Sequence, residues 1–324
     1  MSSIERAMAR ASASVGGIDR ADVIDRLRRT FSSPSYRPPM LPAVALQVME
    51  LSHRPEVRFE DVVLVLQRDP VLAARVLSIA GSAAYAGRAA VLTLQQAAVR
   101  LGLKALRDVV LEAALNLKIF RAPGFDEPMK RLAAHSTAVA HVMRAVCRRT
   151  RIESEYAFLC GLLHDVGFAA GLLALASDPA TRGAPFAELG PALGEAHEEA
   201  SGVLARLWKL PAPLQRVVAT HHEVEVDGRP EPVNAALIVA EQLAWEAGAG
   251  LAPPPEEADP LSLATPEPPL DGLDGNWTGL IDQARAVLKM EDLALGAARA
   301  EAFALVRSLG PEEPRRPGHP APSR

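Results

Sequence analysis

The segment from Tyr156 to Phe168, which reads YAFLCGLLHDVGF, limits the possible folds of this 324-residue chain more than any other stretch. Its leucines and valine recur at i, i+3, i+4 and i+7, the spacing that lines one face of a helix, so we expect one buried helix over the whole segment. His164 and Asp165 stand near its end, about 100° apart around the helix axis, and can both reach into one cleft. Gly161 leaves room one turn earlier, and Gly167 is placed where a helix commonly stops.

We expect a cation to bind in that cleft. Neutral imidazole and carboxylate are ligands for divalent metals, and the C-terminal end of a helix favours positive charge. A histidine next to an aspartate is, taken alone, more often an ordinary buried pair joined by hydrogen bonds. The rest of the chain therefore decides whether His164 and Asp165 bind a metal.

The composition predicts an all-α protein with a sizeable core. Hydrophobic residues make up 49% of the chain and aromatic residues only 4%, and good helix formers such as Ala, Leu, Glu and Arg dominate. The net charge of −4 gives no electrostatic reason to bind nucleic acid or an anionic membrane, and no aromatic platform for bases is visible. We therefore expect neither nucleic acid nor membrane among the partners.

Cysteine usage and the apolar segments favour a cytoplasmic protein. Cys147 and Cys160 cannot form a disulfide framework and make no CxxC pair, so we expect reduced core thiols. Glu5 stands in an N-terminus without a long apolar run, which predicts no secretory signal. The apolar run over residues 157–176 is interrupted by a histidine, an aspartate and glycines, which argues against a membrane span.

The chain divides into a helical first half, a histidine-rich second half and flanking segments. The first half carries no catalytic signature, and its one histidine, His53, is most simply a surface residue. Its helices are expected at 42–51, 59–67, 71–80, 93–101 and 103–120. The expected divisions are a disordered N-terminus at 1–17, a leading helix at 18–33, a domain at 34–248 split near 125, a Pro-rich linker at 249–276, C-terminal helices at 277–288 and 291–309, and a disordered tail at 310–324.

The second half places five of the eight histidines on inward-facing helical stripes. The helices that carry them are expected at 127–150, 156–168, 191–208 and 213–222, and a further helix over 231–248 buries Glu241. An ionised carboxylate there costs several kcal/mol of desolvation unless it meets a cation. The candidate metal ligands are His135, His164, Asp165, His197, His221, His222 and Glu241.

This nitrogen and oxygen set suits one or two ions of iron, manganese, zinc or magnesium. Metal-assisted attack of water on a phosphoryl group would be the natural chemistry, with Asp165 as the candidate catalytic residue. In that case the first ion is expected at His135, His164, Asp165 and Glu241, and a second ion or the phosphate at His197, His221 and His222. The alternative is a set of hydrogen-bonded core histidines that bind no metal, but buried polar groups that converge usually share a partner.

The order of these ligands resembles the HD superfamily of metal-dependent phosphohydrolases and, more closely, the HDOD family of bacterial signalling proteins. The resemblance spans about residues 34–245 and involves both halves. The matching motifs are Leu41-Pro42, Asp69 to Leu72, Gly81 to Tyr85, Ala97 to Gly102, His135-Ser136, Gly161 to Gly167, the run from His197 to Pro211, and His221-His222.

The resemblance implies an all-α domain with a five-helix HD-like core and an N-terminal helical subdomain. It also implies a regulatory or scaffolding output in two-component, chemotaxis, motility or cyclic-nucleotide signalling, in a family for most of whose members no enzymatic activity is established. We therefore favour a signalling module that acts through contacts with partner proteins. The alternative is a metal-dependent phosphohydrolase that acts on a nucleotide or cyclic nucleotide.

A second resemblance, to the HD-GYP phosphodiesterases, rests on His221 to Glu223 and on Asp227-Gly228. The chain departs from that family at three positions. Arg229-Pro230 stands in place of Gly-Tyr-Pro, Phe168 in place of a lysine, and Glu241 in place of an aspartate. The missing lysine removes a phosphate-binding charge, so cleavage of cyclic di-GMP is not expected.

Overall fold

The computed structural model describes residues 18–52, 54–82, 85, 91–153, 155–251 and 277–309, and helices dominate these residues. The expectation of an all-α protein is confirmed. The sheet within this part of the chain is one short antiparallel pair, β1 (Glu225–Val226) and β2 (Arg229–Pro230), joined by Asp227 and Gly228 at positive φ. His53, the expected disordered ends at 1–17 and 310–324, and linker residues 252–276 lie outside the described residues.

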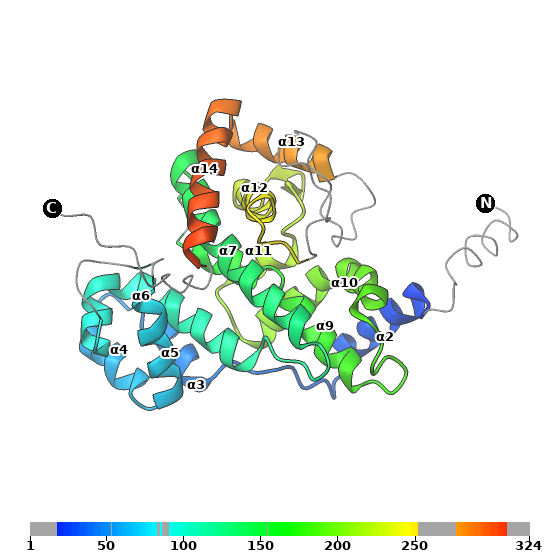
Figure 1. The fold of residues 1–324 in the computed structure, drawn as a ribbon, viewed down its shortest axis with the longest axis horizontal. Helices are drawn as coiled ribbons and strands as arrows, with labels where there is room; N and C mark the ends of the chain where they lie inside the picture. Colours follow the sequence, from blue (N-terminus) through cyan, green and yellow to red (C-terminus); the bar gives the residue numbers. More distant parts are fainter. Residues whose placement is uncertain are drawn as a thin grey trace, which may run out of the picture.

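The first half is a bundle of four helices that follows one leading helix (Figure 1). Side chains cap several of these helices; Asp69, for instance, accepts a hydrogen bond from the backbone N–H of Leu72 at 3.0 Å. Gly102, at φ 73°, kinks the longest helix where the sequence predicted a break between two. The elements are α2 (Arg20–Ser32), α3 (Ala43–Leu51), α4 (Phe59–Leu66), α5 (Pro70–Ala80) and α6 (Leu94–Lys118).

The second half forms the larger helical core, and the leading helix α2 packs on it rather than on the first half. Arg26 of α2 donates to Asp178 at 3.1 Å, which joins the leading helix to the end of α9. The helices of this half are α7 (Asp126–Thr150), α8 (Ala157–Leu163), α9 (Val166–Ser177), α10 (Phe186–Leu207), α11 (Ala212–Ala219) and α12 (Pro232–Glu246).

The expectation of one helix over residues 156–168 is wrong. The chain turns at His164 and Asp165, so that α8 ends and α9 begins there. Ser201 of α10 stabilises this turn, because its hydroxyl donates to His164 O at 2.6 Å and accepts from the Gly167 N–H at 2.9 Å. Gly167 lies in the first turn of α9 instead of stopping a helix. A Cβ at this position would stand 2.0 Å from the carbonyl oxygen of His197, so the glycine allows α9 and α10 to approach closely.

Two other expected boundaries also differ. Helix α10 begins at Phe186, so Pro191 lies inside it rather than at its start. Helix α11 ends at Ala219, where Thr220 leaves helical geometry at φ −143°, so His221 and His222 occupy the following turn and do not continue an apolar helical face.

The C-terminal helices α13 (Trp277–Leu288) and α14 (Asp292–Leu309) pack against α12 and α7. Polar contacts join them to that core: Arg299 pairs with Glu246 at 2.6 Å, and Glu301 accepts from Arg148 at 2.7 Å and Arg149 at 2.8 Å. The division of the chain into domains stays a prediction, but these two helices are structurally continuous with the second half.

The longest apolar stretch among the described residues, Ala157–Ser177, has the length and composition of a membrane span. In this structure 89% of its most apolar window is buried inside the protein, and the turn at His164 and Asp165 divides it. It therefore forms the centre of the core. Cys147 and Cys160 are buried and unpaired.

Candidate metal centre

All seven sequence-predicted ligands come together in the core of the second half. They form two groups, and within each group the ligand atoms lie within 4.8 Å of one another. The groups are His135, His164, Asp165 and Glu241, and His197, His221 and His222. This division matches the two sets that the sequence analysis assigned to a first and a second ion.

Glycines bring the backbones that carry these ligands close together. A Cβ on Gly161 would lie 2.7 Å from the Cα of Ala140, so its absence lets α8 lie against α7, which holds His135. Gly167 does the same between α9 and α10, which holds His197. His164 and Asp165 form the turn between α8 and α9, and the other ligands come from the turn after α11 and from α12.

Asp165 lies between the two groups and faces four imidazoles. Its Oδ2 is 3.5 Å from His135 Nε2 and 3.3 Å from His164 Nε2. Its Oδ1 is 3.4 Å from His197 Nε2 and 3.6 Å from His221 Nε2. Both oxygens are buried and neither has a hydrogen-bond partner, which is costly for a carboxylate unless a cation is close.

In the first group, two histidines turn their Nε2 atoms toward each other. The Nδ1 of His135 lies 2.7 Å from Ala249 O, and that of His164 lies 2.8 Å from Gly161 O. A carbonyl oxygen can only accept, so each Nδ1 carries a proton, and in the neutral tautomer the Nε2 lone pair faces the centre. The two Nε2 atoms are 3.3 Å apart.

The second group repeats this arrangement. His197 donates from Nδ1 to Gly194 O at 2.5 Å, and His221 donates from Nδ1 to Val218 O at 3.2 Å. Their Nε2 atoms are 3.1 Å apart. A divalent cation would stabilise imidazole nitrogens that converge on a buried carboxylate without hydrogen-bond partners. A backbone carbonyl that accepts from the other ring nitrogen is the usual support of a metal-binding histidine. The residues present therefore fit a metal centre.

Glu198 is a site residue that the sequence analysis missed. Its Oε1 accepts from the backbone N–H of His222 at 3.0 Å, and its carboxylate lies 3.6 Å from His221 Nδ1 and 3.8 Å from His222 Nδ1. It orients the turn that carries two ligands. Its position directly after His197 was the only signal available.

The sequence profile of the HDOD domain matches residues 39–224, more than half of the chain. The chain belongs to the HDOD family. Similarity to solved structures shows the same fold. A candidate metal-dependent phosphohydrolase from Shewanella amazonensis is 17% identical with a TM-score of 0.66, covering 90% of this chain and 99% of the other. An HDOD domain protein of unknown function from Geobacter sulfurreducens is 21% identical with a TM-score of 0.57, covering 89% and 99%.

Two further relatives complete the comparison. A candidate signal transduction protein from Marinobacter aquaeolei is 20% identical with a TM-score of 0.56, covering 93% of this chain and 68% of the other. An uncharacterized protein of Treponema pallidum is 24% identical over 196 residues, which are 57% of this chain. The HDOD protein described here spans only 38% of the length of that relative.

The electrostatics of this HDOD core keep its carboxylates ionised. Burial raises the pKa of Asp165, but the facing imidazoles of His164, His221 and His197 outweigh burial and hold that pKa well below its usual range. Burial likewise opposes ionisation of Glu241, but the imidazole of His222, whose Nε2 lies 3.7 Å from Glu241 Oε2, lowers the pKa of Glu241 to about 2. Burial lowers the pKa of His197 to about 4, so that ring is neutral at pH 7. Burial lowers the pKa of His164 and His222, but the facing carboxylates of Asp165 and Glu241 outweigh burial and raise both pKa values. Metals bind ionised carboxylates and neutral imidazoles, so metal binding would release protons from these two rings.

The centre is closed to solvent in this HDOD structure. None of the seven candidate ligands is more than 6% exposed. Trp277 of α13 packs against His222, with ring centroids 5.8 Å apart. A substrate could reach Asp165 only after helices move.

Proposed function

We propose that this HDOD protein is a cytoplasmic regulatory module of bacterial signal transduction, whose buried metal centre holds the second-half helices together and whose output passes through contacts with other proteins. One observation supports the proposal: the site holds a buried carboxylate without hydrogen-bond partners, which favours a bound cation, and its ligands are closed to solvent, which disfavours a substrate. The oxygens of Asp165 are buried without a hydrogen-bond partner, while every ligand is at least nine-tenths buried.

The ligand set supports a structural role for the metal. The ligands come from α7, the α8–α9 turn, α10, the α11 turn and α12, so a bound ion would join elements that are distant in sequence. His135, His164, Asp165 and Glu241 would hold one ion, and His197, His221 and His222 would hold another. When bound, a divalent metal supplies positive charge and Lewis acidity at this point.

The first test is metal content by elemental analysis of the full chain. We expect near-stoichiometric iron, manganese or zinc in the wild type and its loss in the His164→Ala, Asp165→Ala double variant. His141→Gln is the matched control, because His141 is a buried histidine outside the centre. A folded wild type without metal would contradict the metal part of the proposal.

The second test concerns output. A partner identified by crosslinking in cells should bind the purified wild-type protein saturably. The His164→Ala, Asp165→Ala double variant should still bind this partner, and any loss of affinity should match its loss of folded structure. Phosphodiester turnover that the double variant abolishes would overturn the regulatory proposal.

That result would establish the second candidate, a metal-dependent phosphohydrolase acting on a nucleotide or cyclic nucleotide. The observation in its favour is that Asp165 faces both ligand groups, as expected of a carboxylate shared by two ions that act on one phosphoryl group. Its test is a panel of nucleotides and cyclic nucleotides with added manganese or iron, for wild type and double variant. Absence of turnover in wild type that contains metal rejects it.

A further inference from the structure

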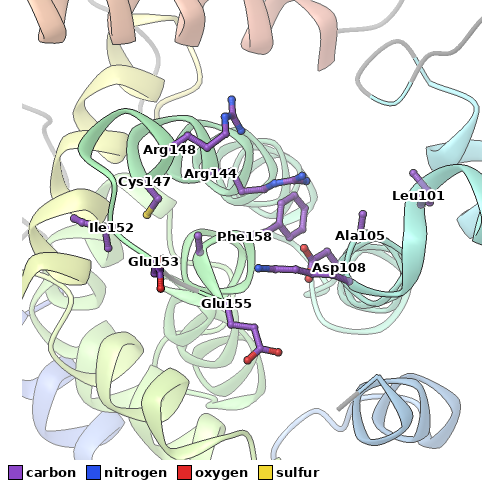
Figure 2. A pocket seen from close by; sticks show the side chains of 12 residues that line it. Leu101, Ala105, Asp108, Arg144, Cys147, Arg148, Ile152, Glu153, Glu155 and Phe158 are labelled. Carbon is purple, nitrogen blue, oxygen red and sulfur yellow. The ribbon is translucent and has the colours of Figure 1, made fainter. Parts of the chain in front are cut away.

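A second polar site lies outside the metal centre, where the first half of the domain meets the second. A cleft lies between α6 on one side and α7 with the α7–α8 turn and α8 on the other, and Figure 2 shows the side chains that line it. The volume of the cleft is about 800 Å³. Its volume falls within the range of small-molecule sites, which is about 300–1,000 Å³. None of the seven candidate metal ligands lines it.

One part of the cleft has two cations without carboxylate partners. Lys104 of α6 and Arg144 of α7 both line it, and neither forms an ion pair with any described residue. The guanidinium of Arg144 lies 5.8 Å from the centre of the Phe158 ring, which braces it. Both cations are close enough to the Asp108 carboxylate to oppose the effect of burial, which raises its pKa.

The Asp108 carboxylate does not form an ion pair with either of these cations, because it already pairs with Arg107. Arg107, 1% exposed, donates from Nε and Nη2 to Asp108 Oδ1 at 3.1 and 3.0 Å. The same guanidinium reaches Glu155 Oε1 at 3.5 Å and the Glu155 carbonyl at 3.2 Å. The charges of Lys104 and Arg144 therefore remain available to an anion.

The cleft is also polarised. In Figure 2, Arg144 and Arg148 lie on one side and Glu153 and Glu155 on the other, with Phe158 between them. Arg148 is paired with Glu301 at 2.7 Å, but Glu153 is exposed and forms no ion pair with a described residue. A ligand that fits both ends would have an anionic group at one end and a donating nitrogen at the other.

We propose that this cleft binds a small organic phosphate that carries an amino group at its other end, with the phosphate between Lys104 and Arg144 and the amino group at Glu153. Phosphate is preferred to a carboxylate because a phosphate monoester carries nearly two negative charges at pH 7, which matches two cations, whereas a carboxylate carries one. A ligand held there would contact both halves of the domain, so it could serve as an input to the proposed regulatory module.

The test is isothermal titration calorimetry of the full chain with three probes: adenosine monophosphate, ribose 5-phosphate and adenosine. We expect adenosine monophosphate to bind, and each of the other two to bind at least tenfold more weakly. The Lys104→Ala, Arg144→Ala double variant should lose at least tenfold in affinity for the monophosphate. Glu153→Gln should weaken the monophosphate but leave ribose 5-phosphate unchanged.

Two controls separate this site from other effects. Lys118→Ala removes an exposed cation from the same helix outside the cleft and should bind like the wild type. The His164→Ala, Asp165→Ala variant should also bind like the wild type, so the proposal stands or falls independently of the metal centre. No binding of adenosine monophosphate at millimolar concentration, or an affinity that the Lys104 and Arg144 substitutions leave unchanged, overturns it.

Discussion

The indole of Trp277 packs edge-on against the imidazole of His222, with ring centroids 5.8 Å apart and ring planes at 85°. Trp277 is the first residue of α13, and its Nε1 donates to Gln242 Oε1 at 2.5 Å. The first residue of the C-terminal helices thus covers His222, one member of the ligand group formed by His197, His221 and His222.

Removal of this cover should speed the exchange of metal. We expect Trp277→Ala to lose metal to a chelator at least several-fold faster than the wild type, because water and chelator gain a path to His222. The measurement is stopped-flow absorbance with a chromophoric chelator. Phe303→Ala, which removes a partly exposed ring from α14, should exchange at the wild-type rate. Equal rates for Trp277→Ala and wild type would show that metal leaves by another path.

The shared position of Asp165 predicts how metal content depends on each ligand. We expect two ions per chain in the wild type, one in His222→Ala, and neither at stoichiometric level in Asp165→Asn, because Asp165 faces both ligand groups. Elemental analysis with a protein concentration from amino-acid analysis measures this. An Asp165→Asn protein that keeps both ions would contradict the shared role.

The close approach of α9 and α10 predicts a strong effect of a single methyl group. A Cβ on Gly167 would stand 2.0 Å from His197 O and 2.7 Å from Ser201 N, so Gly167→Ala must push the two helices apart. We expect the free energy of unfolding to fall by about 1–3 kcal/mol, the usual cost of overpacking. Gly296→Ala in α14 has no atom within 4 Å of the new Cβ and should be neutral or slightly stabilising. Denaturant unfolding of both variants is the measurement.

A buried carboxyl group in the first half predicts a pH dependence of stability. Burial raises the pKa of Glu112 to about 7, and its Oε2 has no hydrogen-bond partner. Because the folded pKa is above the unfolded one, the folded state binds more protons between about pH 4.5 and 7. The free energy of unfolding should therefore fall as pH rises through this window, by up to about 3 kcal/mol.

Glu112→Gln tests this dependence, since the amide replaces the protonated acid without ionising. Denaturant unfolding at pH 5 and pH 8 should show a smaller difference between the two pH values in the variant than in the wild type. Glu60→Gln, at an exposed position of α4, should keep the wild-type difference. A Glu112→Gln protein with an unchanged pH profile would show that Glu112 is ionised in the folded state at both pH values.

Local pattern predicted most of the helices and brought out the seven candidate ligands. Apolar spacing placed His135 and Glu241 on buried faces, and both are buried ligand candidates in the structure. Gly102 marked the kink of α6 correctly, because only glycine readily adopts φ 73°. These features depend on residues within one or two helical turns, and a sequence displays such neighbours directly.

The helix break at His164 and Asp165 was not visible in the same way. The segment has the full periodicity of one helix and contains no proline. The turn is stabilised by Ser201 from a different helix, whose hydroxyl donates a hydrogen bond to the carbonyl of His164 and accepts one from the N–H of Gly167. Glu198 was missed for a similar reason, since its role depends on a turn that begins more than twenty residues later.

The amino-acid sequence by itself determined the all-α class, the HDOD family and the seven residues of the candidate centre, because periodicity and ligand chemistry are properties of short stretches. Only the tertiary structure decided that Asp165 faces both ligand groups, that Trp277 closes the centre, and that Lys104 and Arg144 share a cleft. Each of these relationships joins side chains from separate helices, and their distances depend on how the helices pack.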